Sequence, residues 1–173
     1  MRVETTTRTL YKFDELTPDG QAAAILGLCD INVDYEWWDG VYDDAEQVGL
    51  KLDSFDLDRN RHATGKFILA ANEVAQNILN DHGVECGTYK TAAAFMEEWQ
   101  PVFNNYTDET HPDYESSECE DKLLDIEDEF LKSLLEDYRI MLQHEYEYLQ
   151  SDEAVREMIE ANGYEFTADG KVA

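Results

Sequence analysis

The sequence predicts an α+β fold in which a small antiparallel sheet is packed by several helices. Apolar side chains recur at helical spacing over residues 34–48, and Gly49 is expected to end that helix. In the segment that follows, apolar and polar side chains alternate, which predicts a half-buried β-hairpin. Apolar residues over 120–149 form one wide stripe, which predicts a long amphipathic helix. The adjacent Trp37 and Trp38 carry the largest apolar load, so they are assigned to the core.

The chain of 173 residues is long enough for one acidic domain over residues 1–173 with a sizeable core. An apolar fraction of 43% with 12% aromatic residues argues against simple disorder. Three cysteines form no paired framework, which is typical of a reducing compartment. Because no signal peptide or membrane-spanning run is evident, we expect a soluble protein of the cytoplasm.

The sheet is expected to combine a threonine-rich N-terminal strand over residues 3–12 with a hairpin over residues 50–69. The hairpin turns at Asp58–Arg61. Between the two, Thr17 and Pro18 predict a helix start, since threonine caps the first turn and proline loses no hydrogen bond there.

Three helices are predicted after the hairpin besides the long one. The first covers residues 71–81, and the second covers residues 88–106, where Pro101 is expected to kink it or split it in two. A polar, acidic connection over 107–118 then leads to the long helix. Ser151 is expected to cap a short last helix that ends at Asn162-Gly163.

The charge is the leading anomaly. Forty acidic residues against thirteen basic ones leave a net charge of −27, far beyond what solubility requires. Such a chain repels DNA, RNA and anionic membranes at long range and attracts basic surfaces. We therefore expect no direct nucleic-acid or membrane binding, and a nucleic-acid-binding protein as the natural partner. A merely solubilising surface is the plainer alternative.

The acids are concentrated in two segments. Residues 107–153 hold seventeen acids against three bases, and residues 30–58 hold ten acids against one. Carboxylates two apart on a strand lie about 6.5–7 Å apart, and those four apart on a helix about 6 Å, comparable to neighbouring phosphates. The residues predicted to bind the partner are Asp39, Asp43, Asp44, Glu46, Asp56, Asp58, Asp121, Asp125, Asp128 and Glu129.

Several stretches of the chain also resemble a known family. The order YKFDEL, a proline-started helix, YEWWDGVYDDAEQVGL and then FDLDRNRHATGKF resembles small acidic proteins encoded by phages and prophages, and NGYEFTADGK near the C-terminus fits as well. The resemblance covers most of residues 9–100 and the tail, whereas residues 107–148 match less clearly. It implies a phage accessory protein that acts on host defence, and it supplies no catalytic residues.

Charge and resemblance together predict a phage-encoded, non-enzymatic inhibitor in the host cytoplasm. It would imitate nucleic-acid charge and occupy the DNA- or RNA-binding groove of a CRISPR effector, a restriction enzyme or another nuclease. The alternative is a phage accessory or assembly module whose charge keeps it soluble and selects a basic partner. A homodimer through the long apolar stripe stays open, although its width favours an intramolecular core.

The hairpin turn has part of the residue pattern of a calcium site. Asp56, Asp58 and Asn60 have the one-three-five spacing of a calcium loop. Arg61 stands where the sharp-turn glycine belongs, and Phe67 where the bidentate glutamate belongs. The three side chains are therefore expected to shape the turn.

Zinc binding and catalysis have weaker support. Four residues could be assembled into a zinc site, but their spacing is irregular: His82, Cys86, His111 and Cys119. His82, beside a helix end, is expected to act as a capping donor instead. No nucleophile, phosphate-loop or metalloprotease motif is present, and carboxylate pairs such as Asp43–Asp44 are too abundant to indicate glycosidase chemistry. We expect no enzyme activity, cofactor or metal.

Overall fold

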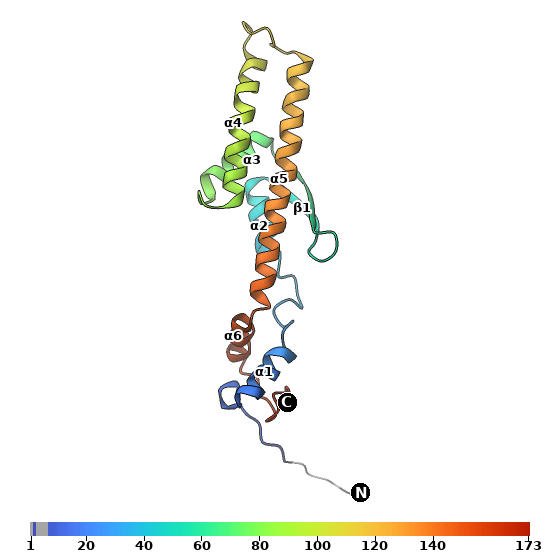
Figure 1. Ribbon diagram of the computed structural model, residues 1–173, viewed down its shortest axis with the longest axis vertical. Coiled ribbons are helices and arrows are strands. Elements are labelled where there is room, and N and C mark those ends of the chain that lie inside the picture. Colours follow the sequence, from blue (N-terminus) through green and yellow to red (C-terminus); the bar gives the residue numbers. More distant parts are fainter. Residues whose placement is uncertain (1, 3–6) are drawn as a thin grey trace. The chain divides into compact units, whose positions relative to one another are not determined.

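The computed structural model describes residue 2 and residues 7–173 (Figure 1). Over these residues it confirms the α+β prediction, with six α-helices and a two-stranded antiparallel sheet packed against them. In chain order the elements are η1 (Phe13–Glu15), α1 (Pro18–Gly27), α2 (Asp39–Val48), β1 (Leu50–Asp56), β2 (His62–Phe67), α3 (Ala71–Asp81), α4 (Gly87–Thr107), α5 (Ser117–Leu149) and α6 (Asp152–Asn162).

The chain packs as two compact units. Residues 38–143 form one, with α2, β1, β2, α3, α4 and most of α5. The other combines residues 1–37 with residues 144–173 and holds η1, α1, the end of α5 and α6. Each unit has its own buried apolar cluster, and a single domain over the whole chain stays a prediction. No helix in the described part of the chain is long and apolar enough to cross a lipid bilayer.

The core of the 38–143 unit is aromatic at its centre. Phe130 of α5 stacks on Phe95 of α4 with ring centroids 4.2 Å apart and lies 5.4 Å from the ring of Phe67 on β2. One turn further along α4, Trp99 stacks on Phe103 at 4.3 Å, and its indole nitrogen donates a hydrogen bond to Glu127. These contacts join α4, α5 and the sheet into one packed layer.

Local sequence rules place the ends of α2 and the hairpin. Gly49 ends α2 with a positive φ of 100°, as predicted, and a Cβ there would stand 2.7 Å from a methyl carbon of Leu69. In the hairpin, Leu50 pairs with Phe67, and the register shifts between Leu52 and Ser54. The second strand ends at Phe67, two residues earlier than the hairpin predicted over residues 50–69.

Two local predictions were wrong: that Pro101 could split α4 in two, and that the two tryptophans lie in the core. α4 runs through Pro101 as one helix, because Trp99 and Val102 on either side are held in the core and proline removes only one backbone hydrogen bond. A kink at Pro101 stays a prediction. The two tryptophans are half-buried, not core residues, because α2 begins only at Asp39. Trp38 packs edge-on against Phe55 at 5.6 Å.

In the second unit, helix caps match the prediction. The Thr17 hydroxyl accepts a hydrogen bond from the Gly20 amide at 3.2 Å, with Pro18 as the first helical residue. The Ser151 hydroxyl likewise accepts from the Ala154 amide at 3.2 Å and begins α6. The core here gathers Phe13, Leu16, Ala24, Val155, Ile159 and Phe166.

The predicted N-terminal strand does not join the hairpin sheet, which has two strands among the described residues. Residues 3–6 of that prediction lie outside the described residues, and residues 7–12 form no strand. Tyr11 instead makes a single antiparallel bridge to Phe166, with reciprocal backbone hydrogen bonds of 2.9 Å. The hydrophobic cluster around Phe166 therefore holds this segment, and threonine propensity alone did not decide its pairing.

Candidate partner-binding surface

The densest charge lies where α4 and α5 are joined. Figure 1 shows α4 beside the first half of α5, with the connection at their common end. We call residues 108–129 the acidic tip: it holds eleven acidic residues and one basic residue, Lys122, a net charge of −10. Ten of the eleven acids are exposed, and Glu127, which binds Trp99, is the half-buried one.

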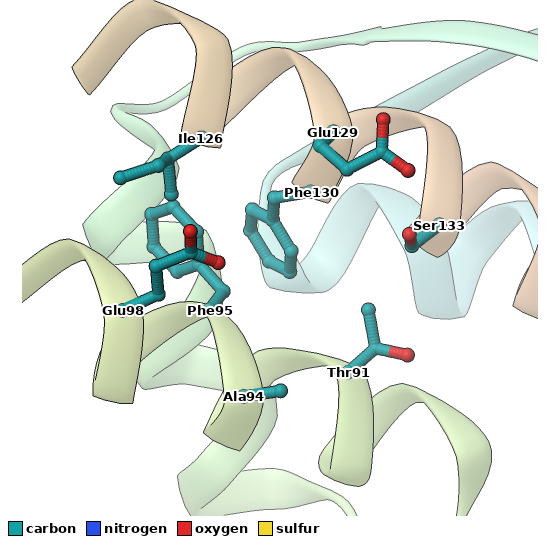
Figure 2. Close-up of a pocket in the computed structure, with 8 residues that line it drawn as sticks. All are labelled: Thr91, Ala94, Phe95, Glu98, Ile126, Glu129, Phe130 and Ser133. Carbon is teal, nitrogen blue, oxygen red and sulfur yellow. The ribbon is translucent and has the colours of Figure 1, made fainter. Parts of the chain in front are cut away.

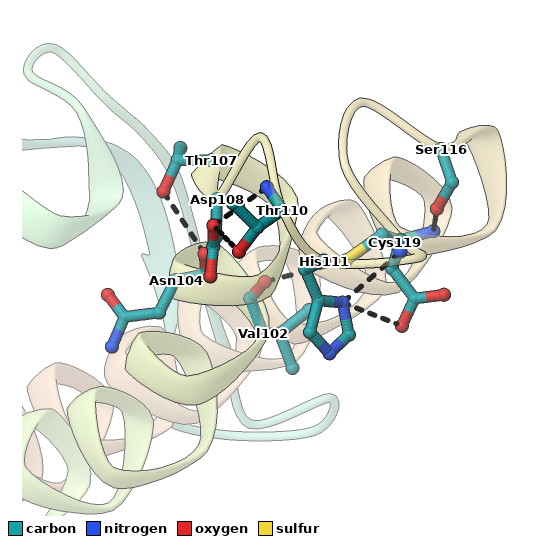
Figure 3. Close-up of polar contacts among 9 residues, drawn as sticks. Val102, Asn104, Thr107, Asp108, Thr110, His111, Ser116 and Cys119 are labelled. Atoms are coloured by element: carbon teal, nitrogen blue, oxygen red, sulfur yellow. Dashed lines mark hydrogen bonds and ion pairs between the residues drawn. The ribbon is translucent and has the colours of Figure 1, made fainter.

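The connection in the acidic tip has a defined structure (Figure 3). Asp108 accepts hydrogen bonds from the amide and the hydroxyl of Thr110, at 2.9 and 2.7 Å. These bonds hold the pKa of Asp108 below its ordinary value, so its charge persists. Glu115 has a positive φ of 47°, and its backbone amide donates a hydrogen bond to the Tyr106 carbonyl. The Cys119 thiol donates to the Val102 carbonyl. The acids of the tip are therefore carried on ordered backbone.

Asp121, Asp125 and Asp128 form an exposed row on α5, four and three residues apart. At 1.5 Å rise per residue, the row is about 10 Å long. Glu129 stands beside it and lies 3.7 Å from the Lys132 ammonium, in a pair whose side chains are both more than 70% exposed. Such an exposed pair contributes little energy and leaves Glu129 available.

The acids of α2 divide into two groups. Asp39, Asp43 and Glu46 are exposed and also follow four-and-three spacing. Asp44 differs, because its carboxylate accepts a hydrogen bond of 2.9 Å from the buried Tyr138 hydroxyl of α5. This contact lies ten residues beyond Asp128, about 15 Å along α5. The α2 row and the α5 row are thus two local groups, and Asp44 holds its helix in place.

The third group is at the hairpin turn. The Asp56 carboxylate accepts a hydrogen bond of 2.8 Å from the Asp58 amide, which closes a side-chain turn. Asp58 is exposed, with the Arg59 guanidinium 4.0 Å away. Among the described residues no three histidine, cysteine or acidic side chains are grouped so that they could hold a metal ion.

A polar cluster that sequence reasoning missed lies around Asp44. His82 Nδ1 is 2.7 Å from the Thr88 hydroxyl, and its Nε2 is 3.5 Å from Asp44. His82 does cap α3, but with its backbone amide, which donates to the Ile78 carbonyl at 2.9 Å, while its side chain makes the contacts above. Burial first, and Asp44 second, raise the pKa of Tyr138. The members come from α2, from the residue that follows α3, from α4 and from α5, so no spacing in the sequence could reveal the cluster.

Replacing Tyr138 with phenylalanine should lower the free energy of unfolding by about 1–2 kcal/mol, the value of a hydrogen bond to a partly exposed carboxylate. The pKa of Tyr138 is raised in the folded protein, so the protonated hydroxyl contributes its full stabilisation below pH about 10, the ordinary pKa of tyrosine. Above that pH the unfolded chain loses the proton first, and the stabilisation is progressively lost. The cost of Tyr138→Phe should therefore shrink above pH 10 in urea unfolding. Tyr148→Phe, at an exposed position, is the control and should show no such cost.

Two hollows lie along the seam between α4 and α5. The first hollow has a volume of about 200 Å³ and a mainly apolar lining. It lies between Glu98 of α4 and Glu129 of α5 (Figure 2). The second, also about 200 Å³, lies toward the acidic tip and is lined by residues that include Val102, Glu118 and Lys122. Of their lining acids, the sequence predicted only Glu129, since pairing of the two helices creates both hollows.

Comparisons with known proteins add no relatives: no family model, curated protein or solved structure matches this chain. The features of this chain that bear on its function are therefore its charge, the acidic tip and the hollows.

Proposed function

We propose that this protein is a phage-encoded inhibitor of a host defence system that imitates nucleic-acid charge. It binds the DNA- or RNA-binding groove of a basic host protein, such as a CRISPR effector, a restriction enzyme or another nuclease. The observation that carries the proposal is the acidic tip, where ten exposed carboxylates share the surface with one lysine. The protein acts by binding, without catalysis or a cofactor.

The affinity would come from charge. A groove tuned to phosphates meets carboxylates about 6 Å apart on α5, and association releases counterions from both surfaces. Affinity should therefore fall steeply as salt rises. Two features favour the acidic tip over a flexible acidic tail. Its acids stand on the first turns of α5 and on a hydrogen-bonded connection, so little conformational entropy is lost on binding.

The second candidate is a phage accessory or assembly module whose charge keeps it soluble and selects a basic partner. One observation favours it: the unit formed by residues 1–37 and 144–173 is also acidic, with fifteen acids and five bases, a net of −10. Charge spread in this way is typical of a solubilising surface. The two candidates differ in whether the acidic tip competes with nucleic acid.

The test is a pull-down from bacterial lysate with the tagged full chain. The bound fraction is washed at stepped salt, with and without excess duplex DNA or RNA. We expect to recover a nucleic-acid-binding protein that the nucleic acid and rising salt both displace. A partner that is retained under both washes contradicts charge mimicry and supports the accessory module.

A further inference from the structure

The first hollow between α4 and α5 combines an apolar floor with acidic sides. Phe95, Ile126 and Phe130 form the floor, and all three are less than 10% exposed. Figure 2 shows Glu98 extending from α4 and Glu129 from α5 on opposite sides of the space. The hollow is therefore shaped for a group that is positively charged at one end and apolar along its length.

Small and hydroxyl side chains leave this hollow open. Ala94 is exposed on α4 and fills little of the space, and Ser133 places its hydroxyl on the α5 side. Thr91 donates its hydroxyl to Asp137 at 2.6 Å, which leaves its methyl group toward the hollow in Figure 2. Lys132 is the base paired with Glu129, and that exposed pair can exchange partners at little cost.

We propose that this hollow receives an arginine side chain of the basic partner. The inference rests on the proposed function, because it names the side chain that such a partner would use. The methylene stem of arginine packs against Ala94 and the apolar floor. Its planar guanidinium offers five donors to the carboxylates on the two sides of the hollow, those of Glu98 and Glu129.

Lysine fits the same hollow less well. Its ammonium is a compact and strongly hydrated point charge, whereas guanidinium is weakly hydrated and tolerates an apolar floor. The hollow therefore favours arginine over lysine, although the two side chains carry the same charge. An acidic surface without a hollow distinguishes them less strongly. Adjacent acids outside the hollow, Glu97 and Asp128, contribute charge without this geometry.

The test measures the affinity of the full-length protein for a labelled oligo-arginine peptide and an oligo-lysine peptide of equal length. Fluorescence anisotropy gives both dissociation constants at one ionic strength. We compare the paired change Glu98→Gln with Glu129→Gln against a control with the same charge, Glu97→Gln with Glu85→Gln, at two exposed acids that do not line the hollow. Ala94→Trp is a third variant, which fills the hollow without changing any charge.

We expect the wild type to prefer oligo-arginine. The Glu98→Gln/Glu129→Gln protein should lose roughly tenfold in affinity for it and bind both peptides alike. Ala94→Trp should remove the preference as well, and the control pair should keep it. If the Gln pair and the control pair weaken both peptides equally, or if Ala94→Trp has no effect, the inference is overturned while salt-dependent binding still supports the proposed function. Failure of both peptides to bind would count against both.

Discussion

Reversing Asp121, Asp125 and Asp128 to lysine should abolish recovery of the basic partner. Each reversal changes the charge by two, so the acidic tip goes from −10 to −4 and the chain from −27 to −21. Three cations would then face a basic groove, and like charges brought together cost several kcal/mol. We expect affinity for the recovered partner to fall by roughly a hundredfold or more.

The control reverses three acids with the same spacing in the other unit, Glu153, Glu157 and Glu160 on the exposed side of α6. This protein has the same net charge of −21 and should keep most of its affinity. Circular dichroism and thermal unfolding check that both triple variants stay folded. Equal loss in the two variants would mean that total charge matters and that the α5 row has no special role.

Replacing Phe130 with alanine should lower the free energy of unfolding by about 3–5 kcal/mol. The ring is 3% exposed, stacks on Phe95 and packs near Phe67, so its removal leaves a cavity where α4, α5 and β2 meet. Neighbouring side chains can collapse into such a space only partly, because each is fixed by its own helix or strand. Urea unfolding followed by circular dichroism measures the change.

Leu124→Ala, on the same helix, is the matched control for this loss. Leu124 is 56% exposed, so its truncation removes little buried surface and should change the stability by less than about 0.5 kcal/mol. If Phe130→Ala were tolerated as well as Leu124→Ala, the stacked aromatic centre would not be what holds α4 against α5.

The sequence predicted most element boundaries because they depend on neighbouring residues. Thr17 and Ser151 cap their helices with their own hydroxyls, and Gly49 supplies a φ that other residues rarely adopt. The spacing of apolar residues also predicted α5, because one face of that helix is buried. The predicted start is three residues after the observed one. These features need no knowledge of what lies across the fold.

Local rules failed where distant contacts outweighed them. Pro101 does not interrupt α4, since the core on either side fixes the helix. Trp37 and Trp38 are half-buried because α2 begins after them, and size alone does not determine burial. Tyr11 bridges to Phe166, a residue more than a hundred and fifty positions away in the chain, and residues 7–12 do not pair with the hairpin.

The same division holds for the candidate site. Composition and spacing by themselves determined that the protein is strongly acidic and that α5 carries an exposed row at Asp121, Asp125 and Asp128. Only the tertiary structure decided that Asp44 turns inward to Tyr138 and that Glu98 stands opposite Glu129 across a hollow. A row depends on the period of one helix, whereas a buried contact or a hollow depends on how two helices pack.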